Sequence, residues 1–553
     1  MKKLGFATLL ALAVFATNVS AAPAKDDAAV KRALDDEMQR AMSKLRLGSE
    51  APPYYVAYTV VDDDVARVSA RLGSLVGEDH NPSRSLRVDV RVGSYDDDNT
   101  NFRGSFGGHG SATVSRDDDY TGLRRDLWEI TDRQYKQALE SFARKKASKT
   151  IETAEKDRMP DFVKLAPVTS VTEKATLATD ADRAKMKDTV QKLSAIFREF
   201  PTVNSGRVDG LVGFARRRMM TSEKTWTDER ESRVRIDVHA ETTTPDGHHI
   251  DTSLAFTSTD VGSLPSFEKM STDVRAMAKN LADQRNAPAV EAGSASVVFE
   301  GEAAAQLAKM LLSQPLSGQP EPKSADSGPR DGSMSFADRI GLKVAPQWLT
   351  VTDDPHAVGA NKKPLCGSYD TDDEGVPGEK LTMIDHGVVK TLFMSRTPRK
   401  EIPKSNGHGR GGWGVHAGQS NLFVHADGGL PRAQLLQRAA QSAGPKGTVY
   451  VVKQLEPSGG LARGQVLTAR VALRLKDGKE EPVRGLSLEG FVPKKMKKDL
   501  VAAGSDSYLL EEDGFAGTST TAPSLLFEDV DISKPNDKSK MPPLYASPLE
   551  ATK

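Results

Sequence analysis

The amino-acid sequence predicts an α+β fold, with a mixed helix and strand region in the N-terminal half and a β-rich C-terminal half. Two observations predict this class. Helix-like and strand-like stretches form separate blocks along the first 290 residues, and strand-like runs dominate beyond residue 340. Such blocks are typical of α+β proteins, whereas a strict alternation of strand and helix indicates an α/β protein.

The size and charge of the chain limit its organisation and its partners. With 553 residues it is long enough for two or more domains. We expect an N-terminal region at 22–290, a C-terminal domain at 291–533 and a weakly ordered tail at 534–553. Lysine plus arginine and aspartate plus glutamate are both 76. The basic excess of a nucleic-acid-binding protein is missing, so we expect no nucleic-acid partner.

The first 21 residues have the pattern of a secretory signal peptide. Lys2 and Lys3 precede an apolar run at 4–16, and small residues follow at 19–22. A retained membrane anchor is the alternative interpretation. No later apolar run reaches the roughly 18 residues of a membrane-spanning helix. We therefore expect an exported protein, periplasmic or extracellular, with no membrane span after signal removal.

Hydrophobic spacing predicts the elements of the N-terminal half. Val30, Leu34 and Met38 recur at helical spacing, which predicts a helix over 25–47. Two strands are expected at 54–62 and 64–75, paired with each other and joined through the acidic residues DDD. Other helices are predicted at 127–157, 181–200 and 265–286, and other strands at 84–93, 211–220, 233–243 and 249–257.

The C-terminal half begins with a strand that runs into a helix. Val297 to Phe299 form an apolar run, and apolar residues then recur at helical spacing up to Leu311. The polar stretch 319–333 is expected to be a surface insertion. Strands are predicted beyond it at 342–352, 380–385, 388–394, 448–455, 465–475 and 482–488.

Four stretches, in this order, resemble the TldD/PmbA family of metallopeptidase-related proteins. These are the strand and helix at 297–318, the Asp-Asp-Glu-Gly segment and hairpin at 367–392, the Ser-Asn-Gly-His-Gly-Arg segment at 405–421, and RGLSLEG at 484–490. The resemblance implies a TldD/E-type C-terminal domain and two subunits that enclose a hollow. It further implies an active subunit that cuts extended peptides with zinc, and a companion subunit without the zinc ligands.

The residues at the expected zinc motif do not suit zinc. The His-Glu-x-x-x-His pattern of active members falls on Gly301, Glu302 and Gln306, and the family's third ligand, a cysteine, falls on Phe515. Zinc is held by imidazole, thiolate or carboxylate groups, and glycine and a neutral amide offer none of these. Glu302 then acts at most as a remnant of the catalytic glutamate, and it can hydrogen-bond Gln306 across one helical turn.

The resemblance therefore predicts an exported non-catalytic partner or a peptide-binding scaffold, without metal or cofactor. We expect it to pair with itself or with a paralogous TldD-like subunit. An extended peptide or unfolded segment is expected to bind by strand addition. The residues expected to bind it are Ser405, Asn406, Gly407, His408 and Arg410.

Two other functions stay open on the sequence. One is an active metal-dependent peptidase, in which zinc is held by an unrecognised set such as Glu302 with His408 or His416. The other is a purely structural envelope protein. Metal content and peptide cleavage distinguish these from a scaffold.

Other polar residues have simpler interpretations. Cys366, the single cysteine, lies far upstream of the expected ligand position and is predicted to be a half-buried, inert thiol. Asp370, Asp372 and Glu374 imitate the start of a calcium loop, but its twelfth position is Leu381 where the loop requires glutamate. These acids are expected in a surface turn, and those at 96–98 in a solvated loop.

Overall fold

The computed structural model describes most of the chain. It covers residues 27–102, 108–149, 159–172, 175, 177–320, 335–359, 362–411, 414–444, 447–456, 466–513 and 516–534. The predicted signal peptide, most of the 319–333 stretch, Phe515 and all but the first residue of the 534–553 tail lie outside the described residues.

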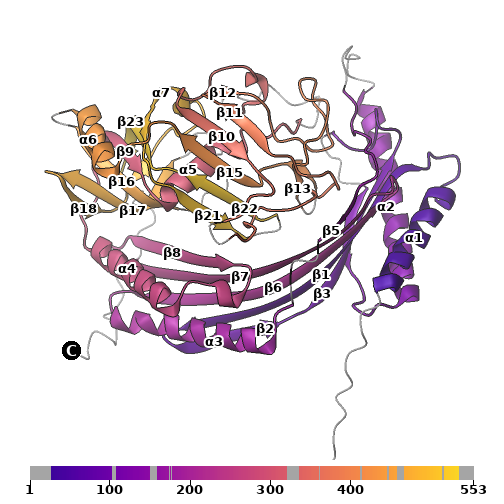
Figure 1. Ribbon diagram of the computed structural model, residues 1–553, viewed down its shortest axis with the longest axis horizontal. Coiled ribbons are helices and arrows are strands. Elements are labelled where there is room, and N and C mark those ends of the chain that lie inside the picture. Colours follow the sequence, from indigo (N-terminus) through magenta and orange to yellow (C-terminus); the bar gives the residue numbers. More distant parts are fainter. Residues whose placement is uncertain are drawn as a thin grey trace, which may run out of the picture.

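The N-terminal region is built on one large sheet of eight strands. Its order is β4-β3-β1-β6-β7-β5, with β2 on β1 and β8 on β7. Three strands of 17 to 19 residues run the length of the sheet and give it a long curve (Figure 1). The strands are β1 (Pro53–Arg71), β2 (Ser74–His80), β3 (Ser83–Val92), β4 (His109–Thr113), β5 (Thr169–Val171), β6 (Ser205–Thr221), β7 (Trp226–Thr243) and β8 (His249–Ser258).

Four helices cover one face of this sheet in two pairs. Val56 and Tyr58 near the start of β1 pack in the core of the first pair, and Val68 and Ala70 near its end pack in the core of the second. All four residues are even-numbered and so lie on one face of the strand. The first pair is α1 (Asp27–Lys44) and α2 (Tyr120–Lys149), and the second is α3 (Asp180–Ala195) and α4 (Phe267–Arg285).

The C-terminal region has two larger sheets with helix α5 between them. One sheet has seven strands and the other has six. Helix α5 (Glu302–Leu312) packs against both, and its alanines and leucines form the middle of the largest core. Its polar residues Glu302, Gln306 and Lys309 recur at helical spacing and are partly buried, so they form one polar stripe on a helix that is otherwise buried.

The seven-stranded sheet consists of β9 (Gly293–Phe299), β16 (Thr448–Leu455), β17 (Leu467–Lys476), β18 (Lys479–Val483), β19 (Ser487–Leu488), β20 (Leu500–Ala503) and β23 (Leu525–Ser533). The six-stranded sheet consists of β10 (Leu349–Asp353), β11 (Leu381–Asp385), β12 (Val388–Val389), β15 (Asn421–Ala426), β21 (Tyr508–Glu512) and β22 (Thr518–Ala522). A two-stranded ladder joins β13 (Gly409–Arg410) to β14 (His416–Ala417), and two further helices are α6 (Arg432–Ala443) and α7 (Lys495–Lys498).

The α+β class predicted from the sequence is confirmed, with mostly antiparallel pairing. The expected strand pair at 54–75 is wrong, because β1 passes straight through Asp62–Asp64 and turns only at Leu72 and Gly73. Asp62 is held inside the sheet by Arg84 and Arg218, so this acidic residue does not mark a turn. Helix α6 was not predicted, although Leu435 and Ala439 have helical spacing.

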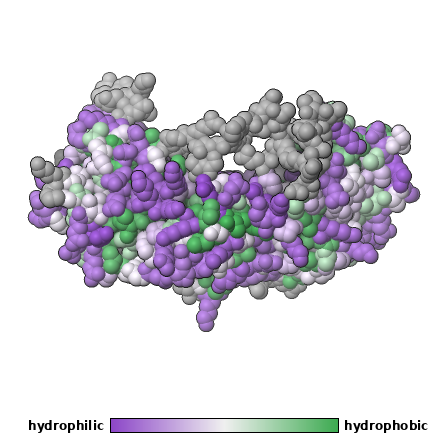
Figure 2. All heavy atoms as spheres, turned by 90° about the horizontal axis from the view of Figure 1, so that it is seen from above, coloured by the Kyte–Doolittle hydropathy of each residue, from purple (hydrophilic) through white to green (hydrophobic). Residues whose placement is uncertain are grey.

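No helix in the described ranges is both long and apolar enough to cross a bilayer. Seen from above, hydrophilic residues dominate, and the hydrophobic residues form smaller patches along the middle of the face (Figure 2).

Candidate functional site at the junction of the two regions

The C-terminal region lies over the face of the large sheet that the four helices leave free (Figure 1). Odd-numbered residues of β8 point toward it. Thr257 donates a hydrogen bond to Glu511 at 2.7 Å, and Asp251 pairs with Arg470 at 2.5 Å. The start of α5, where the zinc motif is expected, lies at this junction.

Gly301 forms the turn from β9 into α5. Its φ of +57° and ψ of −126° belong to a conformation that residues with side chains rarely adopt. A Cβ added here would meet nothing closer than the Tyr508 ring at 3.7 Å. The backbone conformation, and not a lack of space, therefore requires glycine at this position.

Glu302 is the first residue of α5, and its carboxylate is held by two amides. The Gln454 amide lies 3.0 Å from both carboxylate oxygens, and the Gln306 amide donates to one of them at 3.0 Å. The last contact confirms the hydrogen bond expected across one helical turn. Burial raises the pKa of Glu302, while the Gln454 hydrogen bond and the charge of Arg470 oppose this rise.

The two glutamines are themselves fixed by further contacts. Gln306 accepts a hydrogen bond from the backbone N–H of Leu455 at 2.8 Å. Gln454 lies at a β-bulge of β16, where the register against β17 shifts on both sides of it. A bulge turns a side chain away from its regular direction, and Gln454 reaches across to Thr252 and Ser253 of β8.

The residues proposed for a replacement metal site do not come together. Among the described residues, no three His, Cys, Asp or Glu side chains are arranged to hold a metal ion. His408 is fully buried, and its Nε2 lies 3.0 Å from Asp353. His416 is on β14, where burial and, to a smaller extent, His109 lower its pKa. Neither histidine has a contact with Glu302.

The segment expected to bind peptide uses its polar groups within the protein. Ser405 donates to the Met394 carbonyl, and Asn406 donates to the Leu392 carbonyl. The N–H of His408 also bonds Met394, and residues 409–410 pair with β14. Arg410 donates to the Gly517 carbonyl at 2.9 Å. Gly407 allows a close approach to Pro377, with a φ of +72°.

Cys366 lies beside the segment where the resemblance places the missing cysteine ligand. A Cβ on Gly517 would come within 2.3 Å of the Cys366 carbonyl oxygen. Burial raises the pKa of the Cys366 thiol, and the nearby Glu511 raises it further. Metal binding and nucleophilic attack require the thiolate. Cys366 thus lies beside Gly517, and its raised pKa disfavours the thiolate, which agrees with the expectation of a half-buried, inert thiol.

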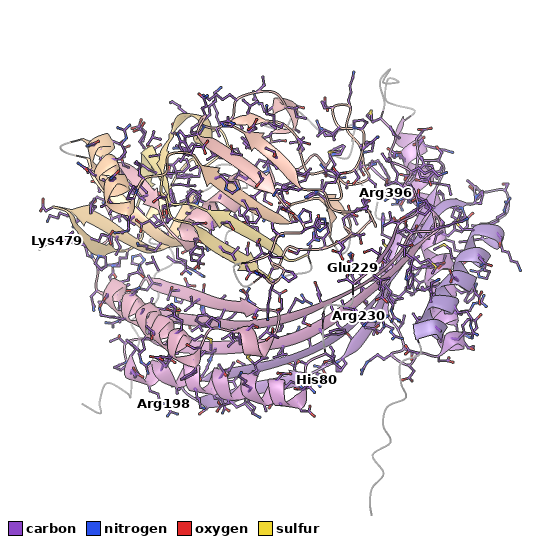
Figure 3. All side chains as sticks on the ribbon, viewed as in Figure 1. His80, Arg198, Glu229, Arg230, Arg396 and Lys479 are labelled. Carbon is purple, nitrogen blue, oxygen red and sulfur yellow. The ribbon has the colours of Figure 1, made fainter. Side chains whose placement is uncertain are left out.

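A second polar contact between the two regions is formed around Arg396. Its guanidinium lies 3.8 Å from the centre of the Phe162 ring and donates at 2.8 Å to Glu223. Arg91 lies 3.6 Å from the same ring. Figure 3 shows Arg396 where a loop of the C-terminal region meets the far end of the large sheet.

Of the three acids expected in a surface turn, Asp372 and Glu374 are buried near Arg396, so the expectation is wrong for these two, whereas Asp370 is exposed. Asp372 is fully buried and accepts three backbone hydrogen bonds, including one from Gly409 at 2.8 Å. Glu374 accepts from the N–H of Arg396 at 2.6 Å. Burial raises the pKa of both carboxyls. Asp98, expected in a solvated loop, is also fully buried and pairs with Arg91.

Comparison with known proteins agrees with this architecture. Residues 292–534 match the family described as "PmbA/TldA metallopeptidase C-terminal domain". A metalloprotease of Methanocaldococcus jannaschii is 40% identical over 76 residues, which cover 14% of this chain and 16% of that protein. The metalloprotease PmbA of Escherichia coli O157:H7 is 28% identical over 179 residues, which cover 32% of this chain and 35% of that protein. The chain thus aligns with about a third of PmbA, and with less of the archaeal protein.

The fold likeness extends over nearly the whole chain. The crystal structure of TldE from Thermococcus kodakarensis superposes with a TM-score of 0.61 at 14% identity, covering 91% of this chain and 100% of that one. The fold and the C-terminal match together define a metallopeptidase-related protein. Residues 292–534 thus belong to the TldD/PmbA family, and the fold likeness to TldE extends over most of the rest of the chain.

Proposed function

We propose that this chain is an exported, non-catalytic member of the TldD/PmbA family that holds extended peptide segments. The main support is the hydrogen-bond network of Glu302. In a zinc hydrolase the glutamate beside the metal takes a proton from the zinc-bound water. Here both oxygens of Glu302 already accept hydrogen bonds from amides, and Gln306 is held by the backbone of Leu455.

The conformation of Gly301 supports the same proposal. A histidine ligand at this position would need a backbone conformation that residues with side chains rarely adopt. A zinc ligand here would therefore require a different turn between β9 and α5, in addition to an imidazole. Replacing Gly301 by histidine would therefore not be enough to restore a zinc ligand at this position.

Export and pairing with a second subunit are part of the proposal. The charged start, apolar run and small residues of the first 21 positions support export. Cell fractionation of the full chain, next to a form without residues 2–21, tests it. Light scattering of the purified protein tests whether it forms a homodimer. A monomer would leave a paralogous TldD-like subunit as the expected partner.

Metal content and peptide cleavage test the absence of catalysis. We expect purified protein to contain far less than one zinc per chain by mass spectrometry. We further expect no chelator-sensitive cleavage of an unstructured peptide, and no effect of Glu302→Gln on any residual activity. Stoichiometric zinc with chelator-sensitive cleavage that is lost in Glu302→Gln would instead show an active peptidase.

A further inference from the structure

Lys145, near the end of α2, is the one buried lysine among the described residues. Its side chain is 4% exposed, whereas that of Lys136 on the same helix is 53% exposed. The other buried side chains with a permanent positive charge in the described ranges are arginines. An arginine keeps its proton in proteins, whereas a buried lysine can give up a proton and act as a nucleophile. Lys145 therefore differs in its possible chemistry from the other buried cations.

Three oxygen atoms hold the amine of Lys145 in one place. Its Nζ donates to the backbone carbonyl of Asp98 at 2.8 Å and to that of Thr100 at 2.6 Å. The third contact is a hydrogen bond of 2.5 Å to Oδ2 of Asp161, a residue that is itself buried. The amine is thus held against a carboxyl group away from water, and such a fixed approach of two reacting groups favours their reaction.

Two neighbouring groups lie where the formation of an amide requires them. The backbone N–H of Asp98 donates to Oδ2 of Asp161 at 2.9 Å. It can therefore stabilise the negative charge that this oxygen gains when the carboxyl carbon is attacked. Asp97 places its Oδ1 3.6 Å from the Nζ of Lys145. The carboxylate of Asp97 can accept a proton from the amine and pass it on.

A covalent bond at this place would anchor the contact around Arg396. Asp161 directly precedes Phe162, whose ring is contacted by the guanidinium groups of Arg91 and Arg396. The chain has a single cysteine, so no disulfide can join two of its own segments. A link between Lys145 and Asp161 would close the chain between them, as a disulfide does, and would restrict the unfolded state.

We propose that Lys145 and Asp161 form an intramolecular amide bond. One proton passes from Nζ to the Asp161 carboxylate, and the resulting amine attacks Cγ of Asp161. The bond between Nζ and Cγ forms, and the bond between Cγ and Oδ1 breaks. A second proton moves from Nζ through Asp97 to the departing oxygen, which leaves as water, and the amide nitrogen keeps the last proton. The reaction needs no oxidant and no further reactant, and it is independent of peptide holding.

Mass spectrometry of the denatured mature chain tests this proposal. We expect the natural chain to be lighter than its sequence by the mass of one water molecule. A proteolytic digest should contain a branched peptide that joins Lys145 to Asp161. Lys145→Arg keeps a cation on α2 that cannot attack, so this variant should have its full mass. Lys136→Arg is the matched control, because its pair with Asp132 is exposed on the same helix, and it should keep the missing water.

A second variant keeps the test decisive if Lys145→Arg folds poorly. Asp97→Asn removes a partly exposed carboxylate and should slow formation of the link about a hundredfold, measured in samples taken at intervals after synthesis. A natural chain with its full mass overturns the proposal, and so does a missing water that the digest places at other residues. An unchanged rate in Asp97→Asn overturns the role of Asp97 alone. Neither result affects the proposed peptide holding.

Discussion

Two of the polar contacts that join the two regions of the chain differ in character. Around Arg396, a guanidinium that is fully buried lies against an aromatic ring and a buried carboxylate. Around Glu302, contact is made by the amide side chain of Gln454, which bonds both the Glu302 carboxylate and the Ser253 carbonyl of β8. A buried cation with fixed partners holds two regions in one orientation, whereas an amide can exchange its partner for another peptide group. The comparison suggests one permanent contact and one replaceable contact.

The largest expected effect is at the permanent contact. Arg396→Ala leaves the carboxylate of Glu223 buried without its cation, so we expect the free energy of unfolding to fall by about 3–5 kcal/mol. Urea denaturation measures this. Arg275→Ala is the matched control, because its pair with Glu199 is half-exposed, and it should change stability far less than Arg396→Ala does. Equal losses in the two variants would contradict the contrast between a buried and an exposed pair.

A smaller loss is expected at the turn next to Glu302. Gly301→Ala places a side chain on a backbone with a φ of +57°, so we expect a cost of about 1–3 kcal/mol without any clash. Gly293→Ala, at the other end of β9, has free space around its Cβ and an ordinary backbone. Thermal unfolding of both variants should separate them. A neutral Gly301→Ala would show that the turn can accept a side chain, and would weaken the proposal of a non-catalytic protein.

The smallest expected effect is a change in pH dependence at the permanent contact. Burial raises the pKa of Asp372 and Glu374, and the charge of Glu374 raises that of Asp372 further. A carboxyl with a raised pKa in the folded chain stabilises it at low pH, and this contribution is lost as the pH rises through the folded value. Arg91, Arg396 and Asp89 face the pair and set how large the rise is.

Glu374→Gln removes the charge that opposes ionisation of Asp372. Stability of the natural chain should fall between about pH 4, the ordinary carboxyl pKa, and about pH 8, the raised pKa of Asp372. The variant should show a flatter profile, by about 1.4 kcal/mol for each unit of pKa change removed. Denaturant unfolding at several pH values measures this slope. Profiles that coincide would mean that the two carboxyls do not influence each other in the folded chain.

The sequence predicted elements well where hydrophobic spacing is regular. The apolar run at Val297 and the following helix are found as β9 and α5, and the hairpin of β7 and β8 around residues 245–248 is also found. The prediction failed at Asp62, because the cations that bury it come from Arg84 and Arg218, far away in the sequence. Spacing along the chain carries no information on such partners.

Only part of the candidate site was predicted from the sequence. Gly301, Glu302 and Gln306 were identified through the family resemblance at the strand-to-helix turn, and the proposal of a site without metal draws on their backbone conformation and hydrogen bonds. Gln454 was missed, although a glutamine in the mostly apolar strand at 449–455 is a signal for a buried polar contact. Its orientation depends on a bulge against β17, and no local pattern predicts that bulge.

The continuous strand β1 has a mechanical consequence for the N-terminal region. Nineteen residues of strand extend for about 60 Å, and the two helix pairs each attach their core to one half of it. Neither half of β1 can unfold without disturbing the other half, because β1 is paired with β6 without interruption from Ala57 to Arg71. The large sheet should therefore unfold as one cooperative unit under force or heat. The two ends of β1 should then exchange their amide hydrogens at matching rates.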